Sequence, residues 1–342
     1  MYIIPNDFIY GLLEAHAIAT SLFVIEWGLH FRFHPLRFVL KARDLIYFPR
    51  GKSGNLLRGA LGLTFRRIAC VPQCRGAQEC EISDSCPYAR MFEPSALERG
   101  PSGFADWPRP FVFRATHLDG QSISPGEAFF FDLNLFDLKN PAIAYLVLAF
   151  SQLAQDGLGP GRGRADLIEV AQLDGEGKPA IRIYDGTSGL LQHEGLTPME
   201  LSLQPGTERV ERVQVRFVTP TELKSGKQVT RRPEFGVLAG RIRDRLSKLR
   251  ELYGEGPLTM DFKEFGERAA LVQMTSCNLG KIDVERRSSR TGQFHSIGGF
   301  VGVAEYEGEL AEFVPFLRAA RWTGVGRQTV WGKGEIELYK LR

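Results

Sequence analysis

The most closely spaced reactive groups in this 342-residue sequence are four cysteine thiols. They lie within 17 residues of one another, in the pattern C-x3-C-x5-C-x5-C. Thiolates this close can supply the tetrahedral coordination of one Zn²⁺ ion. The pattern lacks the C-x2-C pair of common zinc ribbons, so disulfides, free thiols and an iron–sulfur cluster remain alternatives to a structural zinc. The four residues are Cys70, Cys74, Cys80 and Cys86, and the fifth, Cys277, is predicted to be an unpaired core thiol.

A second chemical feature is the glycine-rich segment 324–334. Glycines let a backbone approach a ligand closely and expose its N–H groups. Arg327 and Lys333 add positive charge, so the segment suits phosphate, including an RNA backbone. The alternative is a tight hairpin with incidental charges. A similar segment, 157–164, also carries arginines. The four glycines of segment 324–334 are Gly324, Gly326, Gly332 and Gly334.

Basic residues are concentrated in the second half of the chain, although the formal net charge is only +3. Nine lysines and arginines lie between Lys224 and Arg250, against two acidic residues. This concentration is typical of a polyanion-binding face, with a solvated charged surface as the alternative. A second cluster comprises Lys281, Arg286, Arg287 and Arg290.

The six histidines form no HExxH motif and no nucleophilic triad signature. His295 is the best placed of them, because it follows the arginine cluster and precedes a pair of glycines. His117 lies on a predicted hairpin and is the second candidate. A lone histidine is more often structural than catalytic, so both stay candidates only.

Length and composition limit the class of protein. A chain of 342 residues predicts about two domains. No run of about 18 apolar residues is present, so no transmembrane helix is expected. The N-terminus lacks the basic region of a secretory signal, and five cysteines are too few for a disulfide scaffold. We therefore expect a cytoplasmic protein.

The predicted elements of the first half have the order β-α-β-β-α-β. Strict alternation at 30–40 predicts a strand. Ser53 is predicted to cap a helix over 55–69, in which Gly59 and Gly62 indicate close packing. The remaining elements are strands at 111–114 and 128–136, a helix at 141–155 and a strand at 166–173.

The second half has the same predicted order. Its elements are a strand at 209–217, a helix at 231–252, strands at 270–274 and 298–305, a helix at 309–320 and a strand at 335–341. The predicted fold class is therefore α+β, with two tandem ferredoxin-like (RRM-like) domains. The predicted boundaries are an N-terminal extension 1–30 with a helix at 8–27, a first domain 31–204 with a cysteine-rich insertion 70–92, and a second domain 205–342.

Five short motifs follow one another along the chain, at 53–62, 86–93, 287–293, 298–302 and 324–334. Together they resemble the CRISPR-associated RAMP endoribonucleases that process precursor CRISPR RNA. The resemblance covers residues 30–342, and the closing glycine-rich segment is its most specific part.

The resemblance implies two ferredoxin-like domains side by side, with repeat RNA bound across basic faces. It also implies cleavage without a metal or other cofactor, in which a ribose 2′-hydroxyl attacks the adjacent phosphate. The partners it implies are precursor CRISPR RNA and other subunits of an interference complex, with no membrane. The expected RNA contacts are Arg58, Arg66, Arg67, Arg231, Arg232, Lys281, Arg286, Arg287, Arg290, Gly324, Gly326, Arg327, Gly332, Lys333 and Gly334.

The sequence departs from these relatives at the catalytic position. They often carry a histidine on or just after the first helix, and residues 55–69 contain none. The candidate catalytic residues are then His295, His117 and Arg290. One alternative is a non-catalytic RAMP subunit that binds CRISPR RNA, and a second is a two-domain ligand-binding protein unrelated to RNA.

Overall fold

The computed structural model describes most of the chain outside its N-terminal segment. The predicted helix at 8–27 lies outside the described residues. Two short strands, 285–287 and 294–296, are described by their backbone alone. The described residues are 29–71, 73–94, 107–226, 228–283, 285–287, 294–296 and 298–341.

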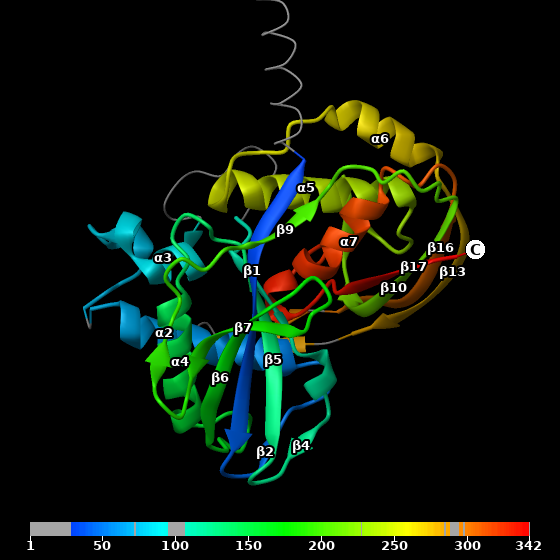
Figure 1. Ribbon diagram of the computed structural model, residues 1–342. Coiled ribbons are helices and arrows are strands. Elements are labelled where there is room, and N and C mark those ends of the chain that lie inside the picture. The colour runs from blue at the N-terminus through cyan, green and yellow to red at the C-terminus, as the bar shows by residue number, and fades with distance from the viewer. Residues whose placement is uncertain are drawn as a thin grey trace, which may run out of the picture.

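The first half forms an antiparallel sheet with two helices on one face (Figure 1). The neighbouring strands follow the order β3-β5-β1-β6-β7-β8, with β9 paired to the start of β1. Its main elements have the predicted β-α-β-β-α-β order. They are β1 (His30–Ala42), α2 (Ser53–Ala69), β3 (Phe111–Arg114), β5 (Ala128–Leu135), α4 (Ile143–Asp156) and β6 (Ala165–Leu173). Smaller elements are β2 (Ile46–Tyr47), η1 (Ala77–Glu79), η2 (Ser83–Ser85), α3 (Pro87–Phe92), η4 (Thr116–Leu118), β4 (Ser122–Ile123), β7 (Pro179–Asp185), β8 (Leu190–Leu191) and β9 (Met199–Ser202).

The second half repeats this plan with the sheet order β13-β16-β10-β17. In both sheets the second and third strands of the unit pair with each other, and the first strand lies between the third and the fourth. The elements are β10 (Arg212–Thr221), β11 (Leu223–Ser225), β12 (Gln228–Thr230), α5 (Phe235–Tyr253), α6 (Phe262–Leu271), β13 (Gln273–Ile282), β14 (Glu285–Arg287), β15 (Phe294–Ser296), β16 (Gly299–Glu307), α7 (Val314–Thr323), η5 (Thr329–Trp331) and β17 (Ile336–Lys340). The helix predicted from residue 231 begins at Phe235, after Pro233, and the strand predicted at 270–274 begins only at Gln273.

The start of α2 is held by a distant carboxylate. Its N-cap residue is Lys52, which makes no side-chain cap. The backbone N–H and the hydroxyl of Ser53 both donate to Oδ1 of Asp119, at 3.0 and 2.5 Å. Asp119, 66 residues further along the chain, therefore accepts the hydrogen bonds that an N-cap side chain would normally accept. The prediction that Ser53 caps this helix is wrong.

The glycines of α2 also differ from expectation. An added Cβ on Gly59 would meet nothing within 4 Å, and one on Gly62 would make an ordinary 3.5 Å contact with Phe92. The close approach occurs at Gly54 instead. There, a Cβ would lie 2.9 Å from the carbonyl oxygen of Trp331 and 3.0 Å from Cα of Gly332.

Strand β1 contributes to the cores of both halves. Its second part, including Leu36 and Phe38, packs beneath α2 and α4. Its first part places Phe31 and Phe33, 1% and 0% exposed, in the core formed mainly by the second half. Phe33 lies 5.4 Å from the ring of Trp322, on α7. Figure 1 shows β1 running from the level of α5 down through the first sheet. The two halves therefore share a core.

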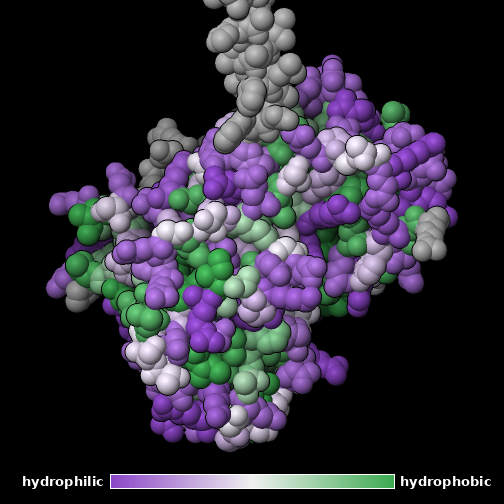
Figure 2. All heavy atoms as spheres, viewed as in Figure 1, coloured by the Kyte–Doolittle hydropathy of each residue, from purple (hydrophilic) through white to green (hydrophobic). Residues whose placement is uncertain are grey.

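The outer surface is unevenly polar. Figure 2 shows hydrophilic side chains over the end of the molecule near α6 and apolar patches over the first half. Exposed apolar residues there include Leu63 on α2 and Leu148 on α4. Within the described ranges, no helix combines the length and apolarity needed to cross a membrane.

We expect Phe33→Ala to lower the free energy of unfolding by about 3–5 kcal/mol, because it leaves a cavity in a fully buried core. Chemical denaturation followed by tryptophan fluorescence measures this loss. Since both halves share that core, the variant should still unfold in a single transition. The control, Leu63→Ala at a position 66% exposed, should shift stability by less than about 0.5 kcal/mol. Separate unfolding of one half would contradict the shared core.

Candidate functional site

A cleft of about 390 Å³ lies where the two halves meet, and we refer to it as the junction cleft. One side is polar and comes from both halves. The other side is apolar and comes mainly from the second sheet. The polar lining includes Arg50, Thr116, Asp119, Thr219 and Lys333, and the apolar lining includes Val218, Pro220, Ile282, Val301 and Trp331.

The glycine-rich segment closes the junction cleft against the start of α2. Lys333 is 3% exposed, and its Nζ donates to the carbonyl oxygen of Gly51 at 2.9 Å. Burial lowers the pKa of Lys333, and the negative charge of Asp119 opposes that shift. Gly332 and Gly54 meet backbone to backbone beside it. The predicted phosphate-binding segment therefore brings the Lys333 amine to the cleft. Burial there destabilises the charged form of this amine relative to its state in water.

Two of the glycines in the segment serve packing within their own half. A Cβ on Gly326 would lie 2.4 Å from the carbonyl oxygen of Glu222, and one on Gly334 would lie 2.0 Å from that of Val325. Both have positive φ, +81° and +70°. Arg327 forms a 2.5 Å ion pair with Glu222. Their role in binding RNA stays a prediction, but their presence is explained without a ligand.

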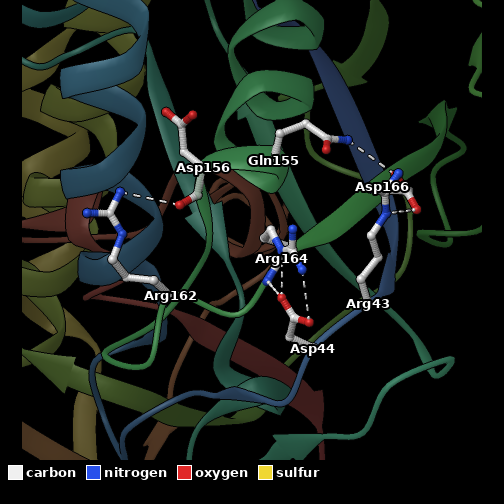
Figure 3. Close-up of polar contacts among 7 residues, drawn as sticks. All are labelled: Arg43, Asp44, Gln155, Asp156, Arg162, Arg164 and Asp166. Atoms are coloured by element: carbon white, nitrogen blue, oxygen red, sulfur yellow. Dashed lines mark hydrogen bonds and ion pairs between the residues drawn. The ribbon is translucent and has the colours of Figure 1, made fainter.

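The similar segment at 157–164 is neutralised by its neighbours. Figure 3 shows Arg164 directed at Asp44 and Arg43 directed at Asp166, with Nε–Oδ2 distances of 2.8 and 2.7 Å. Arg162 donates to the main-chain oxygen of Asp156 at 3.3 Å. The glycines pack on backbone, since a Cβ on Gly163 would lie 2.3 Å from the carbonyl oxygen of Leu45. These contacts support a structural role for segment 157–164, so its similarity to 324–334 adds no support for phosphate binding there.

The basic residues of α5 are used inside the protein. The helix is packed between other elements, and its cations meet carbonyls or carboxylates. Their described contacts are Arg241 Nε to Lys224 O (2.8 Å), Arg243 Nη2 to Asp244 Oδ1 (2.6 Å), Arg245 Nε to Thr323 O (2.9 Å), Lys248 Nζ to Glu251 Oε2 (2.5 Å) and Arg250 Nη1 to His30 O (3.0 Å). The predicted polyanion-binding face is therefore not present on this helix. Helical spacing alone could not distinguish a solvent-facing side from one covered by β1 and α7.

The predicted RNA contacts on α2 are also engaged. Arg66 donates to the carbonyl oxygen of Cys74 at 2.6 Å. Arg67 pairs with Asp156, and the Arg58 guanidinium lies 5.6 Å from the Phe92 ring centroid. These three arginines hold the insertion and α4 in place, and their contact with RNA stays a prediction.

The remaining predicted contacts lie around the second half. Arg231 is exposed, and Arg232 is exposed with Glu234 at 3.6 Å. Lys281 pairs with Asp283 at 2.8 Å. Arg286 and Arg287 lie on β14, which pairs with β15 and places His295 opposite Arg286. Arg290 lies outside the described residues.

The two candidate histidines lie close in the chain to residues that line the junction cleft. His117 follows the cleft residue Thr116, but its ring stacks on Phe130 at 4.4 Å and its Nε2 lies 2.8 Å from the Phe130 carbonyl oxygen. The β14–β15 hairpin that carries His295 connects the strands containing Ile282 and Val301, which both line the cleft. No histidine is among the described lining residues.

Little in the sequence pointed to the polar lining. Arg50 lies in the turn-rich segment before α2, which is a weak signal. Asp119 and Thr116 carried no local signal, because only the tertiary fold brings η4 to the start of α2. Cys277 is exposed on β13, so the prediction of a core thiol is wrong.

Two family models match the chain. Residues 31–196 match a model described as an N-terminal domain, AF_1859_N. Residues 215–336 match the model described as CRISPR-associated endoribonuclease Cas6. No curated protein matches the chain significantly.

Solved structures share the fold. A Cas6 product complex from Thermus thermophilus is 18% identical, with a TM-score of 0.50 over 91% of this chain and 100% of that chain. A partial Cas6-RT-Cas1–Cas2 complex is 13% identical, with a TM-score of 0.53 over 91% of this chain and 46% of that chain. At these identities the likeness shows the fold alone.

The fold and the cleft define an α+β protein of two domains with a Cas6-like architecture. Residues 215–336 thus match the Cas6 family of CRISPR-associated endoribonucleases. This match favours an RNA-processing protein over the predicted alternative of a ligand-binding protein unrelated to RNA.

We expect Gly54→Ala to destabilise the protein and to displace the glycine-rich segment, because its Cβ would collide with the backbone of residues 331 and 332. Thermal unfolding measures the first effect, and proteolysis of the 324–334 segment measures the second. Gly59→Ala is the matched control on the same helix. It meets no atoms and should raise stability by up to about 1 kcal/mol. Equal effects of the two substitutions would contradict the contact at Gly54.

Proposed function

We propose that the chain cleaves precursor CRISPR RNA within its repeats, and that the scissile phosphate binds in the junction cleft. The single observation that carries the location is the meeting of the start of α2 with the glycine-rich segment of the Cas6-family domain. This meeting brings the buried Lys333 and Arg50 together in the polar lining of the junction cleft. Cations beside a phosphate stabilise the extra negative charge of its transition state.

We further infer that each half is a ferredoxin-like unit. The β-α-β-β-α-β order and the shared strand order of the two sheets support this. Both units then contribute lining residues to the junction cleft, so the RNA contacts both at once.

The proposed reaction is an internal transesterification without a metal ion. A base takes the proton of the ribose 2′-hydroxyl, and the 2′-oxygen forms a bond to the adjacent phosphorus. The bond from phosphorus to the 5′-oxygen breaks, and an acid returns a proton to that oxygen. The products are a 2′,3′-cyclic phosphate and a 5′-hydroxyl, so no water is consumed in this step.

Two sources of the proton-transfer group are open to test. Lys333 lies in the cleft, and burial already moves its pKa toward the range in which an amine exchanges protons. His295 lies on the β14–β15 hairpin that connects two cleft strands. His117 and Arg290 remain the other predicted candidates.

The second candidate function is a non-catalytic RAMP subunit that holds CRISPR RNA. It is favoured by one observation on the sequence: residues 55–69, the first helix, contain no histidine, whereas the RAMP endoribonucleases often carry one on or just after that helix. Partners in that case would include other CRISPR-associated subunits. One solved structure of similar fold is a Cas6-RT-Cas1–Cas2 complex, which is an assembly of this kind for that protein.

We expect the purified protein to cleave labelled repeat RNA in EDTA, because the proposed reaction needs no metal. The same RNA with a 2′-deoxy sugar at the scissile position should survive, since it lacks the nucleophile. Gel analysis and end-group mapping measure both results. Tight binding without cleavage would instead support the non-catalytic subunit. Cleavage of the 2′-deoxy RNA would contradict the proposed nucleophile.

We expect Lys333→Met to slow single-turnover cleavage by about 10²–10³-fold, because it removes a cation beside the phosphate. His295→Ala should slow it by ~10²–10⁴-fold with binding retained if that histidine transfers a proton. Lys178→Met, at an exposed lysine on a distant turn, is the control and should change neither rate nor affinity. A wild-type rate for Lys333→Met, in protein with a normal unfolding curve, would remove this lysine from the mechanism.

A further inference from the structure

The cysteine-rich insertion packs around very little apolar core. Its own buried cluster consists of Ala77, Cys86 and Ala89, whereas Met91 and Phe92 at the end of α3 belong to the core of the first half. Two of its larger apolar side chains, Val71 and Ile82, are 55% and 59% exposed. Short segments with so small a core usually need a covalent or metal cross-link to stay ordered.

The Cys70 thiol contacts two of the other thiols of the insertion. Cys70 is the C-cap residue of α2, and Cys86 is the N-cap residue of α3. The Cys70 thiol is hydrogen-bonded to the thiols of both Cys74 and Cys86. Residues that are far apart along the insertion are therefore brought together at the Cys70 thiol.

Polar groups already surround the sulfur of Cys74 in the way expected of a metal-bound thiolate. The backbone N–H of Gly76 donates to it, and the Arg66 guanidinium lies beside it. Such outer contacts orient ligands and stabilise negative charge on sulfur. Gly76 has a φ of +126°, in the region of backbone conformation that favours glycine.

We propose that Cys70, Cys74 and Cys86 bind one zinc ion, with Cys80 as the fourth ligand. Cys80 is the remaining thiol of the insertion and is the C-cap residue of η1, between Cys74 and Cys86 in the chain. Within residues 29–71 and 73–94, no three metal-binding side chains form a ready cage as they stand. Binding therefore requires the thiols to turn from one another toward a common ion.

The binding step involves no oxidation. Each cysteine gives its thiol proton to solvent and donates an electron pair to Zn²⁺, which keeps its charge of +2. The ion would tie the end of α2 to the start of α3. Tyr88 and Phe92 on α3 stack at 5.1 Å and lie against Arg66 and Arg58 of α2, so the ion would fix this contact as well.

The test is metal analysis of the full chain purified without chelator, followed by replacement with Co²⁺. We expect about one equivalent of zinc, and cobalt absorption with the thiolate charge-transfer and visible bands of a tetrahedral site. Cys70→Ser and Cys80→Ser should each lose the tetrathiolate spectrum. Cys277→Ser, at the exposed cysteine on β13, is the matched control and should keep it.

Two outcomes would overturn the proposal. The first is wild-type protein with no bound zinc, no cobalt spectrum and five thiols that react freely with a thiol reagent. The second is protein with no zinc and two thiols missing from that count, which would indicate a disulfide. Both are measured on wild-type protein, so the result does not depend on how well any variant folds. Cleavage activity is not a readout, so failure here would leave the proposed RNA function unaffected.

Discussion

The last turn of α7 is the point on which the arrangement of the two halves depends. Side chains of the first half donate hydrogen bonds to its terminal carbonyl oxygens. Arg114 donates to the carbonyl oxygens of Arg321 and Trp322. Asn134 also donates to the carbonyl oxygen of Trp322, at 2.7 Å. From α5, Arg245 donates to that of Thr323. Burial and the neighbouring Arg114 charge lower the pKa of Arg245 to about 9. Cations at a helix C-terminus also interact favourably with the negative end of the helix dipole. The glycine-rich segment begins at the next residue, so its position follows from these bonds.

The junction cleft is a product of that docking, since neither half contains it alone. Its polar wall joins Arg50 and Asp119 from the first half to Lys333 from the second. Asp119 has two roles there, because it holds the start of α2 through Ser53 and places a negative charge near Lys333. Most other cations in the described part of the chain are bound to carboxylates or carbonyls. Under the proposed function, RNA would be recognised by a few cations in a shaped cleft more than by a broad basic surface.

Local patterns in the sequence predicted the elements of the fold, and long-range contacts account for what they missed. The alternation in β1 and the repeated β-α-β-β-α-β order were readable because side-chain periodicity follows directly from backbone geometry. The cap of α2 could not be predicted from local patterns, because Asp119 is 66 residues from Ser53 in the chain. The charges of α5 were misread because periodicity does not show what covers a helix face. The glycines at 157–164 and 324–334 look alike in sequence, yet one segment packs on 45–47 and the other on the start of α2.

The path of β1 has a consequence for the order in which the protein can be completed. The ribosome makes Phe31 and Phe33 early, but they pack with Val213, Leu238 and Trp322, which come much later in the chain. A nascent first half therefore carries two exposed aromatic rings at the start of its central strand until translation is nearly finished. Phe136 is the one early aromatic partner among the described residues, with its ring 5.8 Å from that of Phe31 and 6.0 Å from that of Phe33. The aromatic contact between Phe33 and Trp322 can form only after α7 has left the exit tunnel, so the core at the start of this strand is completed late in synthesis.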